Sequence, residues 1–83
     1  MTVSELLNTE PQWGQGLSAS RDGTMCLLEA IYAAYTKGGE SAKVVALVKK
    51  YLSLSYDNSI VFWNDHPQRT FADVRQVIEA LDI

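Results

Sequence analysis

The stretch from Trp63 to Thr70, Trp-Asn-Asp-His-Pro-Gln-Arg-Thr, holds the polar side chains best suited to chemistry. It places an amide (Asn64), a carboxylate (Asp65) and a guanidinium (Arg69) just before a helix-capping threonine. A guanidinium forms planar hydrogen bonds to carboxylates and carbonyls. We favour a polar clasp that fixes the start of the last helix against Trp63, with Arg69 reaching Asp65 or loop carbonyls. The alternative is a recognition patch for a partner or an anionic small ligand.

Cys26 and His66 are the only thiol and the only imidazole of the chain. A cysteine nucleophile would need these two side chains to meet. Cys26 lies at the start of the most apolar segment, where a buried, inert thiol is the ordinary outcome. His66 stands between Asp65 and Pro67 and is expected in a solvated turn. We therefore predict no catalytic residue, and an enzyme is the less favoured alternative.

Two spaced glycines flank Gln15 in the segment Trp13-Gly14-Gln15-Gly16. A phosphate-binding loop needs more glycines and a lysine followed by serine or threonine, so close backbone packing around Trp13 is favoured. The carboxylates Asp22, Asp57 and Asp65 are dispersed among predicted turns, so we predict no metal site and no cofactor. The candidate binding residues are Trp13, Gln15, Trp63, Asn64, Asp65 and Arg69.

The composition is that of one small folded domain. The chain has 83 residues, 47% of them hydrophobic, and a formal net charge of −3. This charge argues against binding to a nucleic-acid backbone.

The first ten residues lack a basic, apolar leader, and the longest apolar stretch, Met25–Tyr35, is too short for a bilayer span. We expect a cytoplasmic protein with no membrane association and a reduced thiol.

The spacing of apolar residues predicts the helices that carry the candidate residues. Thr2 and Glu5 match a capping box for a short first helix. Thr24 is the expected cap of a central helix over Met25–Tyr35, and Arg21-Asp22-Gly23 is expected to form a turn before it. Within that helix the expected inner stripe is Leu28, Ile31, Tyr32 and Tyr35, and it is widened by Leu27, Ala30 and Ala34.

A second long helix is expected from Glu40 or Ser41 onward. Its inner stripe follows helical spacing through Val44, Leu47, Val48, Tyr51 and Leu52. Asp57-Asn58-Ser59 is a turn signal, and the β-prone run Ile60–Trp63 is expected to be extended, with a helical turn as the alternative.

Thr70, with Asp73, is expected to cap the last helix. Its inner stripe is Phe71, Val74, Val77, Ile78 and Leu81, whereas Arg75, Gln76, Glu79 and Asp82 are expected to face water. The prediction is an all-α, compact single domain over residues 1–83. It has three main helices, a short N-terminal helix and a short extended segment around Ile60–Trp63.

Three motifs together resemble a small bacterial and phage family of unknown function. They are Trp13-Gly14-Gln15-Gly16, Cys26-Leu27-Leu28 with Ala30, and Trp63-Asn64-Asp65 with Pro67 and Arg69-Thr70. The resemblance runs in order over most of the chain. It implies a bacterial or phage cytoplasmic context and brings no known reaction.

We expect a small non-catalytic module that binds another protein or itself, as a homodimer, in an accessory or inhibitory role. The chain has eight aromatic side chains, more than so small a core readily hides, and exposed aromatic residues are good interface anchors. The alternative is a small-ligand-binding protein or an enzyme that uses Asn64, Asp65 and Arg69, or Cys26 with His66. No nucleic-acid partner is expected.

Overall fold

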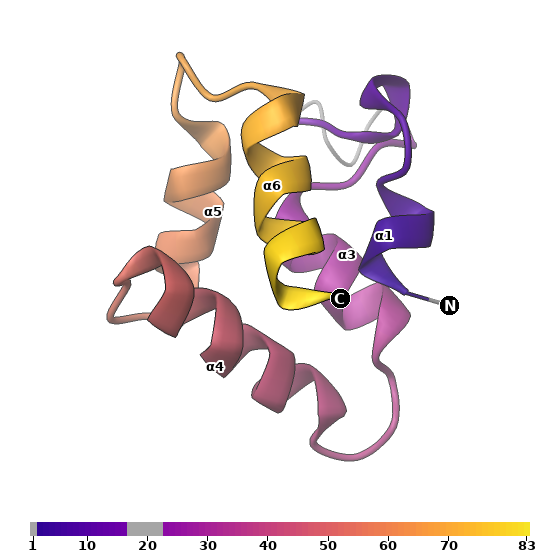
Figure 1. Ribbon diagram of the computed structural model, residues 1–83, viewed down its shortest axis with the longest axis vertical. Helices are drawn as coiled ribbons and strands as arrows, with labels where there is room; N and C mark the ends of the chain where they lie inside the picture. Colours follow the sequence, from indigo (N-terminus) through magenta and orange to yellow (C-terminus); the bar gives the residue numbers. More distant parts are fainter. Residues whose placement is uncertain (1, 17–22) are drawn as a thin grey trace.

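The computed structural model describes residues 2–16 and 23–83 (Figure 1). In these ranges the chain is all-α and contains no sheet, as predicted; an isolated bridge joins Trp13 to Met25. In chain order the elements are α1 (Val3–Leu6), the 3₁₀ turn η1 (Glu10–Gln12), α3 (Leu27–Ala34), α4 (Glu40–Leu52), α5 (Asn58–Asp65) and α6 (Phe71–Leu81). The turn expected at Arg21-Asp22-Gly23 falls largely outside the described residues.

The short helix α1 is held at its amino end. Thr2 and Glu5 form the predicted capping box, with the Thr2 Oγ1 accepting from the Glu5 backbone N–H at 3.2 Å. The Val3 N–H donates to the Ile83 backbone oxygen at 2.8 Å, which joins the two ends of the described chain (Figure 1). A four-residue helix, about one turn, is not stable alone in water, so α1 depends on such tertiary contacts.

Helix α3 lies at the centre and packs against α1, α4 and α5. Its N-cap is Cys26, two residues after the expected Thr24, because the Cys26 thiol and the Glu29 side chain form the reciprocal bonds of a capping box. Leu28 and Ile31 are buried as predicted, whereas Tyr32 is 47% exposed. Leu27 and Ala30, which were expected to widen the stripe, are fully buried, so the inner face of α3 lies on their side and not on that of Tyr32.

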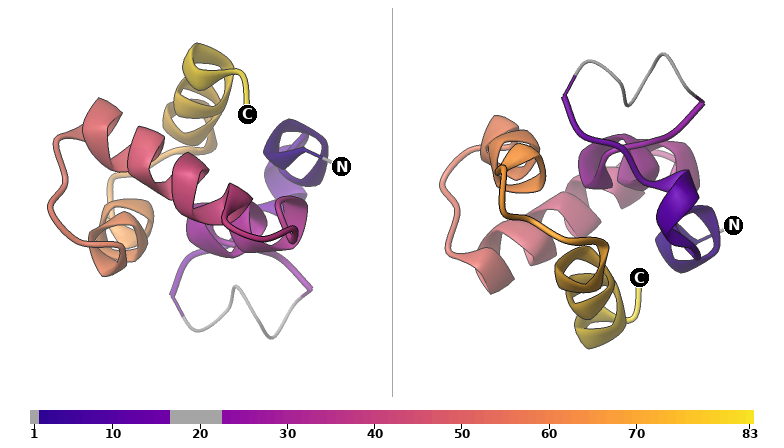
Figure 2. Two further views of the ribbon diagram at one scale, coloured as in Figure 1. Left: turned by 90° about the horizontal axis from the view of Figure 1, so that it is seen from below. Right: turned by 90° about the horizontal axis from the view of Figure 1, so that it is seen from above.

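Helix α4 crosses the domain and packs against both α3 and α6, as the view from below shows (Figure 2). It begins at Glu40, one of the two predicted positions, after Gly39 with φ +81°. Two members of the expected inner stripe, Leu47 and Tyr51, are 48% and 44% exposed, and Val45 is buried in their place. The helix is rotated toward Val45 because its contact face is shared between two neighbours.

Helix α5 corrects the sequence prediction. The segment Ile60–Trp63, expected to be extended, forms the middle of this helix, and the turn signal at Asp57-Asn58-Ser59 marks its beginning. Ile60 and Asn64 are four residues apart and are both fully buried on one helical face. That long-range burial outweighs the β-propensity of a short apolar run.

Helix α6 follows the prediction closely. The Thr70 Oγ1 accepts from the Asp73 backbone N–H at 3.2 Å, and the Asp73 carboxylate accepts from the Thr70 N–H at 3.1 Å. Arg75, expected to face water, instead donates from Nη1 to the backbone oxygens of Ser4 and Leu7, each at 3.2 Å. It satisfies carbonyls that a helix as short as α1 leaves unpaired.

The core combines one face of every α-helix. Its buried apolar side chains are Val3, Leu7, Cys26, Leu27, Leu28, Ala30, Ile31, Val44, Val45, Val48, Ile60, Val74, Val77, Ile78 and Ile83.

Candidate functional site

Asn64 is the fully buried polar residue at the centre of the motif region. Its Oδ1 accepts from the Trp13 indole Nε1–H at 2.7 Å and from the Leu27 backbone N–H at 3.0 Å. Its Nδ2 donates to the Gly14 carbonyl at 3.0 Å and to Asp65 Oδ1 at 3.0 Å. One amide thereby fills both its donor and its acceptor capacity inside the protein.

The Leu27 N–H is the first of the α3 amide groups that no helical carbonyl can reach. Asn64, at the end of α5, therefore completes the start of α3. Asn64 was expected in a clasp at the start of the last helix, where Thr70 and Asp73 form the cap as predicted. Its side chain instead caps a helix that begins 37 residues earlier.

The segment around Gln15 crosses the end of α5. It is anchored by backbone bonds from the Met25 N–H to the Gln12 carbonyl and from the Gly14 N–H to the Met25 carbonyl, each 3.0 Å. The Gln15 Nε2 donates to the backbone oxygens of Asn64 at 2.8 Å and His66 at 3.0 Å. The Asn64 oxygen belongs to the last turn of α5, where helical donors run out, and the His66 oxygen, at the C-cap, also accepts the Arg69 backbone N–H at 2.9 Å.

Asp65 ties the same segment from the other side. Its Oδ1 accepts from the Gly16 backbone N–H at 2.9 Å as well as from Asn64. Gly16 has φ +59°, a conformation that glycine adopts without strain. A Cβ atom at Gly16 would meet nothing within 4 Å, so its left-handed backbone, and not the close packing predicted around Trp13, calls for glycine there.

Arg69 lies against Trp63. Its Nε donates to the Trp63 carbonyl at 2.8 Å, its guanidinium carbon lies 4.0 Å from the centre of the Trp63 ring, and its Nη1 is 3.9 Å from Asp73 Oδ2. The guanidinium therefore reaches a carbonyl in the last turn of α5, whereas the expected partners were loop carbonyls or Asp65. In the described ranges no bond or ion pair joins it to Asp65.

All six predicted binding residues thus lie in one region, and each makes contacts within the protein. Trp13 also contacts Phe71 at the start of α6, with ring centroids 6.2 Å apart. Together these contacts hold α3, α5, α6 and the Trp13–Gly16 segment to one another. A direct role for the six residues in binding a partner stays a prediction.

Cys26 and His66 occupy different structural roles. The Cys26 thiol is buried, accepts from the Glu29 N–H at 3.5 Å, and burial raises its pKa. A raised pKa disfavours the thiolate that a nucleophile requires. The exposed His66 ends α5, and its Nδ1 accepts from the Gln68 N–H at 3.1 Å. The contacts of Cys26 and His66 are therefore with other residues, and the two side chains do not form a nucleophile–base pair.

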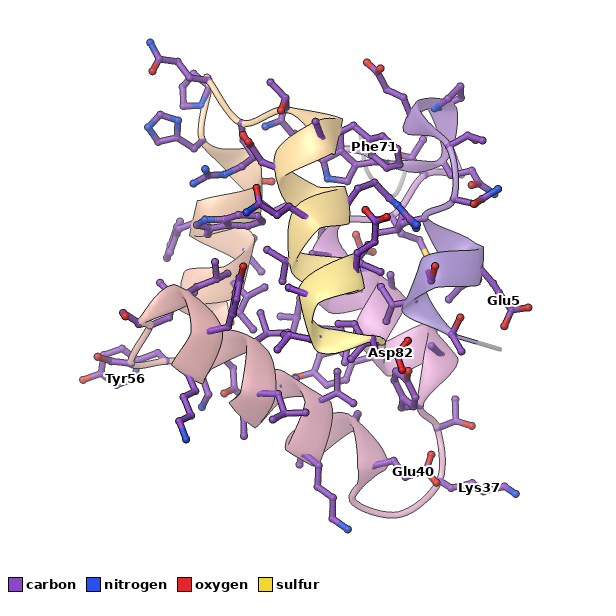
Figure 3. All side chains as sticks on the ribbon, in the orientation of Figure 1. Glu5, Lys37, Glu40, Tyr56, Phe71 and Asp82 are labelled. Carbon is purple, nitrogen blue, oxygen red and sulfur yellow. The ribbon has the colours of Figure 1, made fainter. Side chains whose placement is uncertain are left out.

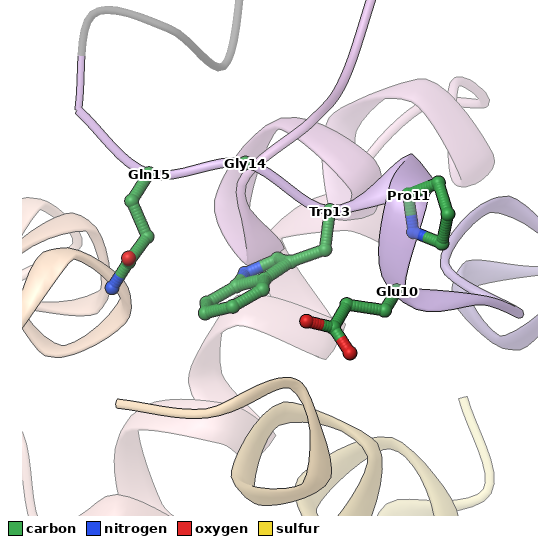
Figure 4. A pocket seen from close by; sticks show the side chains of 5 residues that line it. All are labelled: Glu10, Pro11, Trp13, Gly14 and Gln15. Carbon is green, nitrogen blue, oxygen red and sulfur yellow. The ribbon is translucent and has the colours of Figure 1, made fainter. Parts of the chain in front are cut away.

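An open pocket of about 520 Å³ lies beside Trp13 (Figure 4). Its lining residues in the described part of the chain are Glu10, Pro11, Trp13, Gly14 and Gln15. In Figure 4 the Glu10 carboxylate lies on the same side of the segment as the Trp13 ring.

Among residues 2–16 and 23–83, no group of three or more His, Cys, Asp or Glu side chains is arranged to hold a metal ion.

The sequence profile of a family of unknown function, DUF6197, matches residues 2–81. The chain belongs to this family. The match covers α1 through α6, so the DUF6197 domain and the structural domain coincide. Neither the curated proteins nor the solved structures include a match to this DUF6197 chain. In the part of the chain that the structure describes, no helix is long and apolar enough to cross a membrane.

Two aromatic side chains that the sequence did not indicate as a site are exposed at the surface. Phe62 is 76% exposed and Tyr56 is 75% exposed. Figure 3 shows Tyr56 projecting from the connection between α4 and α5. The excess of aromatic residues was the available signal, but the sequence did not show which of them the core would leave outside.

Proposed function

We propose that this DUF6197 chain is a non-catalytic protein-binding module, with an accessory or inhibitory role in a bacterium or phage. The observation that carries the proposal is the exposure of large apolar side chains while the polar motif is engaged internally. Phe62 and Tyr56 are each about three-quarters exposed, and Tyr32, Leu47 and Tyr51 are about half exposed.

Exposed aromatic side chains are costly to leave in water and effective at interfaces. Phe62 has no polar atom on its side chain, and burying such a group against a partner contributes roughly 1.5–3 kcal/mol. Tyrosine adds a hydroxyl that can hydrogen-bond at the edge of an interface. The bacterial or phage origin rests on the motif resemblance.

Affinity capture with surface variants tests the proposal. The bait is the full chain, immobilised and exposed to a lysate of the organism that encodes it. The test variant is Phe62→Ser with Tyr56→Ser, and the control is Gln76→Ser, which changes an exposed residue of α6. We expect the parent and the control to recover the same stoichiometric protein, and the double variant to recover at least about tenfold less.

Equal recovery by all three baits would contradict the use of this surface. A parent chain that recovers no protein and remains monomeric in sedimentation velocity would contradict the protein-binding function itself. A homodimer that the double variant disrupts would support the module and identify its partner as a second copy.

The pocket beside Trp13 supports a second candidate, a small-ligand-binding protein. It is concave, it combines an aromatic ring with a carboxylate, and it includes two of the predicted binding residues, Trp13 and Gln15. A metabolite screen by thermal shift tests this candidate. A saturable stabilisation that is lost in Glu10→Gln, while the capture experiment recovers nothing, would favour it over the module.

A further inference from the structure

Helix α4 carries a mixed basic and apolar face on its solvent side. Lys43, Leu47, Lys50 and Tyr51 are spaced i, i+4, i+7 and i+8, so they share one side of the helix. All four are exposed, with Leu47 and Tyr51 at 48% and 44%. At a rise of roughly 1.5 Å per residue, the face is about 12 Å long.

The charges on this face are available to a partner. Lys49, on the same helix, pairs with Asp57 at 2.7 Å, whereas no ion pair engages Lys43 or Lys50 within residues 2–16 and 23–83. Glu40, the carboxylate of α4, stands in its first turn on the same side of the helix, three residues before Lys43. A chain with a net charge of −3 thus has a locally positive strip, Lys43 and Lys50, along one edge of the two apolar side chains, with one carboxylate at its amino end.

We propose that this α4 face, Lys43, Leu47, Lys50 and Tyr51, binds an acidic amphipathic helix of another protein. The apolar stripe of the partner covers Leu47 and Tyr51, and carboxylates along one edge of that stripe pair with Lys43 and Lys50. The inference rests on the proposed protein-binding function and adds the chemistry of the partner. The locally positive strip favours an acidic partner over a second copy of this acidic chain.

Three synthetic helical peptides test the proposal. They share one leucine stripe and carry Glu, Gln or Lys at the flanking positions. Each is titrated into the ¹⁵N-labelled full chain and followed by amide chemical shifts. We expect shifts centred on residues 43–51 and a Kd for the Glu peptide at least about tenfold below that for the Lys peptide, since each exposed ion pair contributes up to about 1 kcal/mol.

Matched charge reversals locate the binding face. Lys50→Glu should reduce the preference for the Glu peptide about fivefold or more, since it removes an attraction and adds a repulsion. Lys37→Glu makes the same change in net charge in the loop before α4 (Figure 3) and should change the preference less than about twofold. Thermal melting of both variants checks that the fold is intact.

Several outcomes would overturn the assignment of this face. They are equal binding of the three peptides, an unchanged preference in Lys50→Glu, and no shift up to about 1 mM peptide. Concentration-dependent shifts at residues 43–51 without peptide would identify a second copy as the occupant. Binding to phosphatidylserine vesicles in preference to the Glu peptide would identify a membrane. Shifts centred on Phe62 would overturn this face and leave the proposed function standing.

Discussion

The Asn64 Oδ1 accepts the Leu27 backbone N–H at 3.0 Å, so a residue at the end of α5 completes the amino end of α3. The same oxygen accepts the Trp13 indole N–H at 2.7 Å. One buried amide therefore fixes three segments that are distant in sequence. The polar groups of the Trp-Asn-Asp motif are therefore used mainly in hydrogen bonds within the fold, and few of them are left for a partner.

Asn64→Ala should destabilise the protein severely. It leaves the Trp13 indole N–H, the Leu27 N–H and the Gly14 carbonyl without their partner. Each unsatisfied buried group costs about 1–3 kcal/mol, so we expect a loss of about 3 kcal/mol or more in the free energy of unfolding. Urea denaturation measures this loss, and Asn58→Ala, at an exposed position of the same helix, is the control. A loss in Asn64→Ala no larger than in the control would contradict the clasp.

Asp65→Ala and Arg69→Ala should each lower the free energy of unfolding by about 1–2 kcal/mol. Asp65 bonds to Asn64 and Gly16, whereas Arg69 bonds to Trp63, so the two side chains act on separate contacts. Their double-mutant cycle should therefore be additive within about 0.5 kcal/mol. A coupling above about 1 kcal/mol would show a direct pairing.

Arg69→Lys should recover little of the stability lost in Arg69→Ala, because lysine lacks the planar group that stacks on Trp63.

Cys26 should react slowly with an alkylating reagent in the native protein. The thiol is buried, and desolvation raises its pKa, so the thiolate is scarce near neutral pH. In denaturant the same reagent should react at the rate of a free cysteine. Mass spectrometry over a time course measures both rates. Native labelling as fast as denatured labelling would restore the cysteine nucleophile as a candidate.

Tyr35 should make stability depend on pH in the alkaline range. Its hydroxyl donates to the Ile83 backbone oxygen at 2.8 Å, and burial, with the charges of Asp82 and Glu40, raises its pKa. The unfolded tyrosine ionises near pH 10, before the folded one does. The stabilisation is therefore present below about pH 10 and is lost as the pH rises toward the folded pKa.

Tyr35→Phe isolates this contribution, because the other titrating groups are common to both proteins. The variant should lose about 1 kcal/mol near neutral pH, and the difference from the parent should shrink between about pH 9 and 11. Chemical denaturation at several pH values measures the difference. A difference that stays constant over this range would contradict the hydrogen bond.

Most local parts of the fold could be predicted, except the capping box of Cys26 and Glu29, where a thiol takes the place of the expected Thr24 hydroxyl; the distant contacts could not. The capping boxes at Thr2 and Thr70 lie within four consecutive residues, so the sequence displays them directly. The helix at Ile60–Trp63 could not be seen in the same way, because burial of Ile60 and Asn64 against other segments decides it.

For the candidate site too, the sequence indicated the residues but not their distant partners. The sequence identified Asn64 and Gln15 as polar residues of interest, but their partners lie 37 to 51 residues away. The exposure of Tyr51 depends on how α4 is shared between α3 and α6, which local periodicity does not specify.

Hydrogen exchange of the two indole N–H groups tests most directly that Asn64 is engaged within the fold. The Trp13 Nε1–H is bonded to Asn64, whereas the Trp63 indole N–H has no bond to the described residues and serves as an internal reference. We predict that the Trp13 signal exchanges slowly in the parent and at least about tenfold faster in Asn64→Ala, with the Trp63 signal fast in both. Trp13 exchange in the parent as fast as that of Trp63 would contradict the clasp.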